Sequence, residues 1–128
     1  MRTLHRSHRI LLVDEELELL LTAGNYFSWL GFEVDMASTL EEAQALLRSR
    51  TYGAVVADVR LAGSDARPGL QMTRMARAIS ATTRIVLLSA GPLPERDVRR
   101  HGADMVLPKP KPLPEVADCL ISLLQGTV

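Results

Sequence analysis

Cysteine, an excess of one charge and long apolar runs are all missing from this sequence, and each absence removes a class of protein. Cys119 is the only cysteine among 128 residues, so no internal disulfide can form and no cysteine-based metal site is available. A reducing compartment fits such a chain. Basic and acidic residues both number 15, so no overall basic field would attract nucleic acid or an anionic membrane surface.

The start of the chain also lacks the features of a targeting segment. Its basic opening, MRTLHRSHRI, leads into an apolar run that Asp14 interrupts. This run is too short for a signal peptide or a membrane span. Because no internal repeat, linker or low-complexity tract follows, the sequence predicts one cytoplasmic domain over residues 1–128, with a flexible tail over residues 1–8.

What the sequence does contain is a strict alternation of strand-like and helix-like segments. The expected strands are 9–16, 32–37, 54–59, 84–90 and 103–110, and the expected helices are 17–31, 38–50, 70–80, 92–102 and 113–124. Such alternation predicts a doubly wound α/β fold with a parallel sheet covered by helices on both faces.

Smaller signals mark the ends of these segments. Ser38 and Glu41 have the spacing of a capping box, and Gly31 is expected to end the helix before it. Trp29 and Phe32, on either side of Gly31, are expected to pack in the core. The segment 60–69, rich in glycine and small polar residues, is predicted to be a loop.

Polar side chains follow four of the five expected strands at the point where each strand ends. Ligands of such sheets bind at the carboxyl ends of the strands. The residues at these ends are Asp14 and Glu15, Asp58, Ser89, and Lys109. The sequence therefore predicts that three carboxylates, a hydroxyl and an ammonium meet at one edge of the sheet.

This set of groups suits phosphoryl transfer. Three neighbouring carboxylates repel one another, and Mg²⁺, which takes one or two carboxylates, waters and a phosphate oxygen, removes that penalty. Lys109 can pair with a phosphoryl group and Ser89 can donate a hydrogen bond to it. Asp58, at the centre of the sheet, is then the candidate nucleophile that becomes an aspartyl phosphate.

Four short motifs in order along the chain resemble the receiver (chemotaxis-Y-like) domain of bacterial two-component response regulators. LLVDEE is similar to the acidic pair of that family, and VVADVRL to its phosphoacceptor strand. VLLSA is similar to its Ser/Thr-Ala position, and LPKP to its lysine followed by a cis-proline. The resemblance spans residues 8–125 and implies a flavodoxin-like strand order, 2-1-3-4-5.

The resemblance also implies how the acceptor and the metal are held. Asp58 would accept a phosphoryl group from a phosphohistidine on a sensor histidine kinase or a phosphotransfer protein. Glu15 and Asp58 would bind Mg²⁺ directly, Asp14 would bind it through water, and the Arg60 backbone carbonyl would be a further ligand.

The same resemblance implies how a signal leaves the site. Lys109, Ser89 and the Ala90 backbone N–H would hold the phosphoryl oxygens. Movement of Ser89 would then repack the face formed by the helix 92–102, the strand 103–110 and the helix 113–124, through which a homodimer is expected. On this interpretation the protein is a signalling switch that catalyses its own phosphorylation and dephosphorylation.

Three departures from the family pattern keep a second interpretation open. Val106 stands where receivers usually carry an aromatic switch residue, and Lys111 stands where an apolar residue often follows the Lys-Pro pair. Ala62 replaces a common proline, and the residues 66–68 read as an insertion before Gly69. The alternative is a pseudo-receiver, an interaction module that works without phosphorylation.

The remaining alternatives fit less well. A dinucleotide or flavin enzyme needs a glycine-rich loop after the first strand, and VDEELE has no glycine. A haloacid-type phosphatase needs a second aspartate two residues after the nucleophile, where this chain has Arg60. Arg60 and Arg67 could assist a phosphate, but solvent-facing arginine is the favoured interpretation of both.

Overall fold

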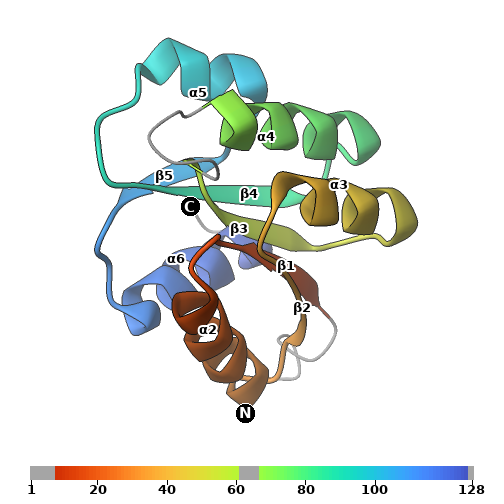
Figure 1. The fold of residues 1–128 in the computed structure, drawn as a ribbon, viewed down its shortest axis with the longest axis vertical. Coiled ribbons are helices and arrows are strands. Elements are labelled where there is room, and N and C mark those ends of the chain that lie inside the picture. Colours follow the sequence, from red (N-terminus) through yellow and green to blue (C-terminus); the bar gives the residue numbers. More distant parts are fainter. Residues whose placement is uncertain (1–7, 61–66, 127–128) are drawn as a thin grey trace.

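The computed structural model describes residues 8–60 and 67–126, and in these ranges five strands alternate with five helices (Figure 1). The strands are β1 (Arg9–Val13), β2 (Glu33–Ala37), β3 (Ala54–Asp58), β4 (Arg84–Ser89) and β5 (Met105–Pro108). The helices are α2 (Leu17–Trp29), α3 (Leu40–Ser49), α4 (Arg67–Ile79), α5 (Glu95–His101) and α6 (Leu113–Gln125). None of these helices has the length and apolar character needed to cross a membrane.

The five strands form one parallel sheet in the order β2-β1-β3-β4-β5, as the sequence predicted. Helices α3, α4 and α5 cover one face of the sheet, and α2 and α6 cover the other (Figure 1). Strand β3 lies at the centre of the order, so its carboxyl end has a neighbouring strand on each side. A side chain placed there is held by the most constrained part of the fold.

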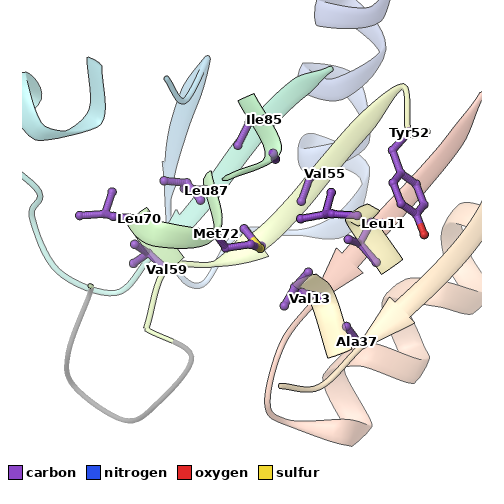
Figure 2. Packing of buried hydrophobic residues seen from close by; sticks show 14 residues of the cluster. Leu11, Val13, Ala37, Tyr52, Val55, Val59, Leu70, Met72, Ile85 and Leu87 are labelled. Carbon is purple, nitrogen blue, oxygen red and sulfur yellow. The ribbon is translucent and has the colours of Figure 1, made fainter. Parts of the chain in front are cut away.

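Successive residues of the central strands alternate between two cores, because side chains of a strand point to opposite faces. Leu11, Val55 and Leu87 pack with residues of α3 and α4 on one side, where Figure 2 shows Met72 of α4 among them. Ile10, Val56 and Val86 pack with α2 and α6 on the other side. Both sheet faces are therefore buried, and the strands have fixed registers.

The first seven residues of the predicted tail lie outside the described residues. His8, the last of the eight, is half-buried, and its backbone carbonyl accepts a hydrogen bond of 3.1 Å from the Glu33 amide. This hydrogen bond extends the pairing of β1 with β2 by one residue toward the amino terminus.

One detail at the helix ends differs from the sequence prediction and one agrees with it. The capping box of α3 lies one residue later than expected: the Thr39 hydroxyl accepts from the Glu42 amide at 3.1 Å, and the Glu42 carboxylate accepts from the Ser38 amide at 2.8 Å. The reason is that the helix begins at Leu40, which makes Thr39 the N-cap. Gly31, with a φ of 107°, follows the end of α2 as predicted.

The segment predicted as a loop over 60–69 is partly helical. Helix α4 begins at Arg67, so Arg67, Pro68 and Gly69 form its first turn, whereas residues 61–66 lie outside the described residues. Proline suits this place because the first turn of a helix does not use its backbone N–H groups. The glycine and small polar residues before it masked this start in the sequence.

Trp29 does not pack in the core, whereas Phe32 does. The Trp29 residue is 79% exposed and Phe32 is 4% exposed. Phe27 already fills the core-facing side of α2, and a residue two positions later lies on the opposite side of a helix. Burial of Phe27 therefore places Trp29 toward solvent.

Arg77 joins four elements at the amino ends of β4 and β5. Its guanidinium donates to the Thr83 carbonyl at 2.7 Å, to the Gly102 carbonyl at 2.9 Å and to the Asp104 carboxylate at 2.9 Å. The same Asp104 oxygen accepts from the Ile85 amide at 2.7 Å. This network connects the end of α4 and the end of α5 to the first residues of two strands.

Gly69 lets α4 lie directly on the chain that leaves β3. Its amide donates to the Val59 carbonyl at 3.2 Å, and a Cβ atom at this position would lie 2.6 Å from the Val59 Cα. These are backbone atoms, so no side chain can move aside to make room. Only glycine fits here.

We expect Gly69→Ala to lower the free energy of unfolding by about 2–3 kcal/mol, because the added methyl group must push the α4 backbone off Val59. Gly24→Ala is the matched control. Its Cβ would meet the Met36 Sδ at 2.6 Å, and the Met36 side chain is flexible and 41% exposed. The control should be neutral or gain up to about 1 kcal/mol from helix propensity. Urea denaturation measures both, and equal losses would contradict this account.

We expect Arg77→Ala to lower the free energy of unfolding by about 2–3 kcal/mol, because several carbonyls and the Asp104 carboxylate lose a charged donor. Arg77→Lys should recover less than half of this, since one ammonium cannot replace the planar fork. Arg99→Ala, which breaks only the exposed pair with Glu95 at 3.3 Å, is the control and should cost less than about 0.5 kcal/mol. A similar loss in all three variants would exclude the network as the cause.

Candidate functional site

The strand registers place the predicted polar residues at one edge of the sheet. Asp58 pairs with Leu88, and Ser89 pairs with Pro108, so Lys109 lies one residue beyond the end of β5. Asp14 follows Val13 directly, and its amide donates to the Ala37 carbonyl at 3.1 Å. The site is therefore built on the last residues of strands whose cores fix their positions.

Asp14, Asp58 and Lys109 come together as an ion-paired cluster. The Lys109 ammonium lies 2.8 Å from the Asp58 Oδ2 and 3.7 Å from the Asp14 Oδ2. The second oxygen of Asp58 accepts from the Arg60 amide at 3.0 Å, and that of Asp14 from the Glu16 amide at 2.9 Å. Both carboxylates are only about one-seventh exposed, at 13% and 14%, so each needs these partners.

The surroundings of Lys109 favour its charged form. Burial disfavours the ammonium, but the hydrogen bond to Asp58 and the negative charges of Asp14 and Asp58 outweigh burial and raise the pKa of Lys109 above its ordinary value. Lys109 is therefore a permanent cation beside Asp58 at neutral pH.

Glu15 lies apart from this cluster. It is exposed and lines a cavity of about 480 Å³ with Leu17, Ser38, Thr39, Leu40, Glu41 and Pro68. Within residues 8–60 and 67–126, no three acidic, histidine or cysteine side chains gather into a metal-binding group. Mg²⁺, however, keeps several waters and needs only one or two carboxylates, so the pair Asp14 and Asp58 fits this ion.

Ser89 is buried, at 4% exposure, and its hydroxyl points into its own loop. The Oγ atom donates to the Gly91 carbonyl at 2.6 Å. Ala90, between them, is exposed. Ser89 also lines a cavity of about 370 Å³ whose other walls include Gly91, Leu93 and Val106. The valine thus borders open space next to the Ser89 loop.

Of the two arginines that the sequence predicts to face solvent, Arg60 and Arg67, one is placed differently. Arg60 is half-buried rather than solvent-facing, and its Nη2 atom would lie 3.3 Å from a Cβ atom at Gly91. Arg67 is exposed, as expected. The sequence carried no signal for this placement, because Arg60 and Gly91 come close only when β3 and β4 pair in the sheet.

Lys111 lies beside the cluster on its other side. It helps line a cavity of about 190 Å³ together with Asp14, Leu19, Thr22, Ala23, Leu88, Lys109, Pro110 and Leu113. Its ammonium lies 3.6 Å from the Glu115 carboxylate on the first turn of α6. The charge that replaces an apolar residue is thus directed toward α6.

Comparison with known proteins agrees with the family resemblance and with the fold. A model of the response regulator receiver domain matches residues 10–120. The response regulator MprA of Mycolicibacterium vanbaalenii is 32% identical over 121 residues, which cover 93% of this chain and 51% of MprA. The chain thus spans about half the length of this relative.

Solved structures show the same architecture. A CheY-like receiver domain protein from Methanospirillum hungatei has a TM-score of 0.85 at 20% identity, over 94% of this chain and 95% of that one, which supports the fold alone. The response regulator TrrA of Thermotoga maritima, solved in complex with Mg²⁺-BeF, has a TM-score of 0.77 at 27% identity, over 91% of this chain and 98% of that one.

We expect Asp58→Asn to lower the pKa of Lys109, because burial then opposes the ammonium with less compensation. Since Lys109 and Lys111 are the only lysines, NMR titration in a Lys111→Arg background follows a single lysine signal. A raised pKa in the folded state stabilises the protein below the unfolded value of about 10.4, and this contribution is lost as the pH rises through the higher folded value.

The control for this titration is Asp118→Asn, an exposed position on α6. The control should leave the Lys109 titration unchanged. An unchanged pKa in Asp58→Asn would contradict the assigned ion pair.

Proposed function

The chain belongs to the response regulator receiver domain family, and on that premise we propose that it is a phosphorelay receiver whose acceptor is Asp58. The single observation that supports this most directly is the contact of 2.8 Å between the Lys109 ammonium and the Asp58 carboxylate, at the end of the central strand. A half-buried acid paired with a cation at the carboxyl ends of the strands is suited to carry a phosphoryl group.

The proposed donor is a phosphohistidine on a sensor histidine kinase or a phosphotransfer protein. An Asp58 oxygen attacks phosphorus and forms a new P–O bond while the P–N bond breaks. The imidazole nitrogen leaves with that electron pair, and Asp58 becomes an aspartyl phosphate. Lys109 neutralises the negative charge that the phosphoryl group brings into a site already holding Asp14.

Magnesium is the proposed cofactor, and the carboxylates of Asp14 and Asp58 with the Arg60 backbone carbonyl are the groups proposed to hold it. When bound, it would supply positive charge against the phosphoryl oxygens. Glu15 belongs to this set only if its side chain turns from the cavity beside α3 toward Asp58. Its longer reach makes that motion accessible.

The proposed switch begins at Ser89, with Ala90 offering its backbone N–H to the phosphoryl group. To donate to a phosphoryl oxygen, the Ser89 hydroxyl must leave the Gly91 carbonyl, which it now contacts at 2.6 Å. That loop leads into α5, so the change would reach the face formed by α5, β5 and α6. Val106 has no aromatic ring that could change its rotamer in response to the movement of Ser89. We therefore propose that the backbone after Ser89 transmits this movement to the face.

The alternative function is a pseudo-receiver that binds partners without phosphorylation. Val106 favours the pseudo-receiver, because it replaces the aromatic switch residue that receivers usually carry at this position. The complete set of Asp14, Asp58, Ser89 and Lys109 favours the phosphorylated switch. We propose the switch, because a pseudo-receiver has no need to keep a half-buried acid and a half-buried ammonium together.

The setting of the protein is proposed on the same basis. We place it in the cytoplasm, where kinases of this kind act, with the α5–β5–α6 face available for a homodimer and with no direct contact to nucleic acid or membrane. It would catalyse only its own phosphorylation and dephosphorylation. MprA, of which the chain covers about half, bears the name of a response regulator.

We expect Mg²⁺ and acetyl phosphate to add one phosphoryl group to the protein, detected by intact mass. Asp58→Asn should abolish the adduct, and removal of Mg²⁺ with a chelator should prevent it. Lys109→Met should slow its formation at least about tenfold, because one preorganised charge is lost.

Asp118→Asn is the control for these variants and should form the adduct at the rate of the unchanged protein. A protein that stays unmodified under these conditions, or an adduct that persists in Asp58→Asn, would favour the pseudo-receiver.

A further inference from the structure

Two adjoining cavities lie between α2 and α6, the helices that cover the same face of the sheet (Figure 1). The outer cavity, of about 190 Å³, has the exposed residues Leu19 and Thr22 in its wall. The inner cavity, of about 60 Å³, has the buried residues Phe27, Val56 and Val116 in its wall. Six residues line both cavities: Asp14, Leu19, Ala23, Leu88, Lys111 and Leu113. The space therefore leads from the surface into the core.

Lys111 accounts for part of this open space. It stands where receivers often carry an apolar residue, and its ammonium lies 3.6 Å from the carboxylate of Glu115 on α6. The charged end of the side chain is thus directed toward α6, and the aliphatic stem is the part left to line the cavities. A narrow, unbranched stem fills less of this space than an aromatic ring would.

The inner wall suits an apolar group. Phe27, Val56 and Val116 offer it only carbon atoms. Across residues 8–60 and 67–126, every buried side-chain nitrogen or oxygen already has a hydrogen-bond partner. A bound water needs two to four polar partners, so an apolar occupant is favoured over water in this part of the space.

The charged side chains of the outer wall favour an anion. Lys109 and Lys111 bring two positive charges and Asp14 brings one negative charge. Lys109 is held by Asp58 and Asp14, at 2.8 and 3.7 Å. The pair of Lys111 is with Glu115, whose side chain is 60% exposed, and such a pair contributes little. Lys111 is therefore the cation that an incoming anion can recruit at small cost.

From these observations we propose that the space between α2 and α6 is a binding site for a small aromatic carboxylic acid. The ring enters the apolar cavities, and the carboxylate pairs with the Lys111 ammonium. The size fits one ring, because an engineered apolar cavity of about 150 Å³ binds benzene, whereas drug-sized ligands need about 300–1,000 Å³. A rigid ring also loses little conformational freedom on binding.

This site lies beside the acceptor but is separate from it. Asp14 and Lys109 belong to the wall of the outer cavity and also to the ion-paired cluster with Asp58. A bound acid should therefore be sensed by Lys109 as well as by Lys111. The inference concerns the unmodified protein, so it does not depend on phosphorylation.

The test is an NMR titration of the unmodified protein with benzoate, in the absence of Mg²⁺ and of a phosphoryl donor. We expect saturable shifts of the methyl signals of Leu19, Leu88 and Leu113 and of both lysine signals, with a Kd of about 1 mM or below. Benzamide, which has the same shape without the charge, should bind roughly fivefold more weakly, the contribution of one exposed ion pair. Acetate, which lacks the ring, should cause no saturable shift of the leucine methyl signals.

Three variants separate the charge from the space. Lys111→Gln keeps a polar stem and removes the charge, so it should weaken benzoate roughly fivefold and leave benzamide unchanged. Ala23→Leu fills the space from α2 and should abolish binding of both compounds. Lys111→Phe fills it from the opposite wall, and it should abolish binding and raise the melting temperature of the ligand-free protein.

Ala45→Leu is the matched control for Ala23→Leu. It adds the same side chain at an exposed position of α3, and it should bind benzoate like the unchanged protein. Benzamide that binds as tightly as benzoate, or benzoate that still binds when both filling variants are folded, would overturn the site. Leucine methyl signals that do not move would overturn it as well. Failure of acetyl phosphate to modify the protein would reject the proposed function and leave this inference in place.

Discussion

The ion pair of Asp58 and Lys109 is the interaction on which the rest of the site depends. Two carboxylates, Asp14 and Asp58, lie largely shielded from solvent within reach of one ammonium, so these three side chains carry a net formal charge of −1. Without Lys109 the two acids would repel in a poorly solvated place. The distance of 2.8 Å between its ammonium and Asp58 requires that β3, β4 and β5 end in a fixed stagger, which the two cores enforce from both faces of the sheet. The electrostatics of the site is thus a consequence of strand register.

The amino and carboxyl ends of the strands are held in different ways. At the amino ends of β4 and β5, Arg77 and Asp104 connect four elements through several charged hydrogen bonds. At the carboxyl end of β4, the Ser89 hydroxyl holds the following loop through one bond to the Gly91 carbonyl. A charge added at Asp58 therefore acts beside the loop that this one side-chain bond holds, while the network around Arg77 keeps the end of α5 in place. On the proposed function, this difference directs a rearrangement to the loop and to the beginning of α5.

The fold and the ion-paired cluster could be predicted because both follow from strong and regular signals. Buried strands have few polar residues, so the acids and the lysine at their ends stand out, and parallel strands bring those ends together. The start of α4 at Arg67 could not be predicted in this way, because the small residues before it resemble a loop. The prediction for Trp29 was wrong because aromatic residues are typical of a core, whereas the burial of this residue depends on which side of α2 it occupies. The position of Arg60 could not be predicted because it depends on its approach to Gly91. These two residues lie in separate loops that come close only in the folded sheet.

Val106 and Gly91 indicate how this receiver could transmit a signal without an aromatic switch residue. The valine borders a cavity beside Ser89, and filling or emptying such a space would need a side chain that can swing, which valine lacks. Gly91, in contrast, accepts a hydrogen bond from the Ser89 hydroxyl through its carbonyl. On the proposed function the Ser89 hydroxyl is attracted to the phosphoryl group, so its movement acts on Gly91, a residue with an unusually free backbone. The loop after β4, and not residue 106, is then the part of this chain in which a charge at Asp58 becomes a change of shape.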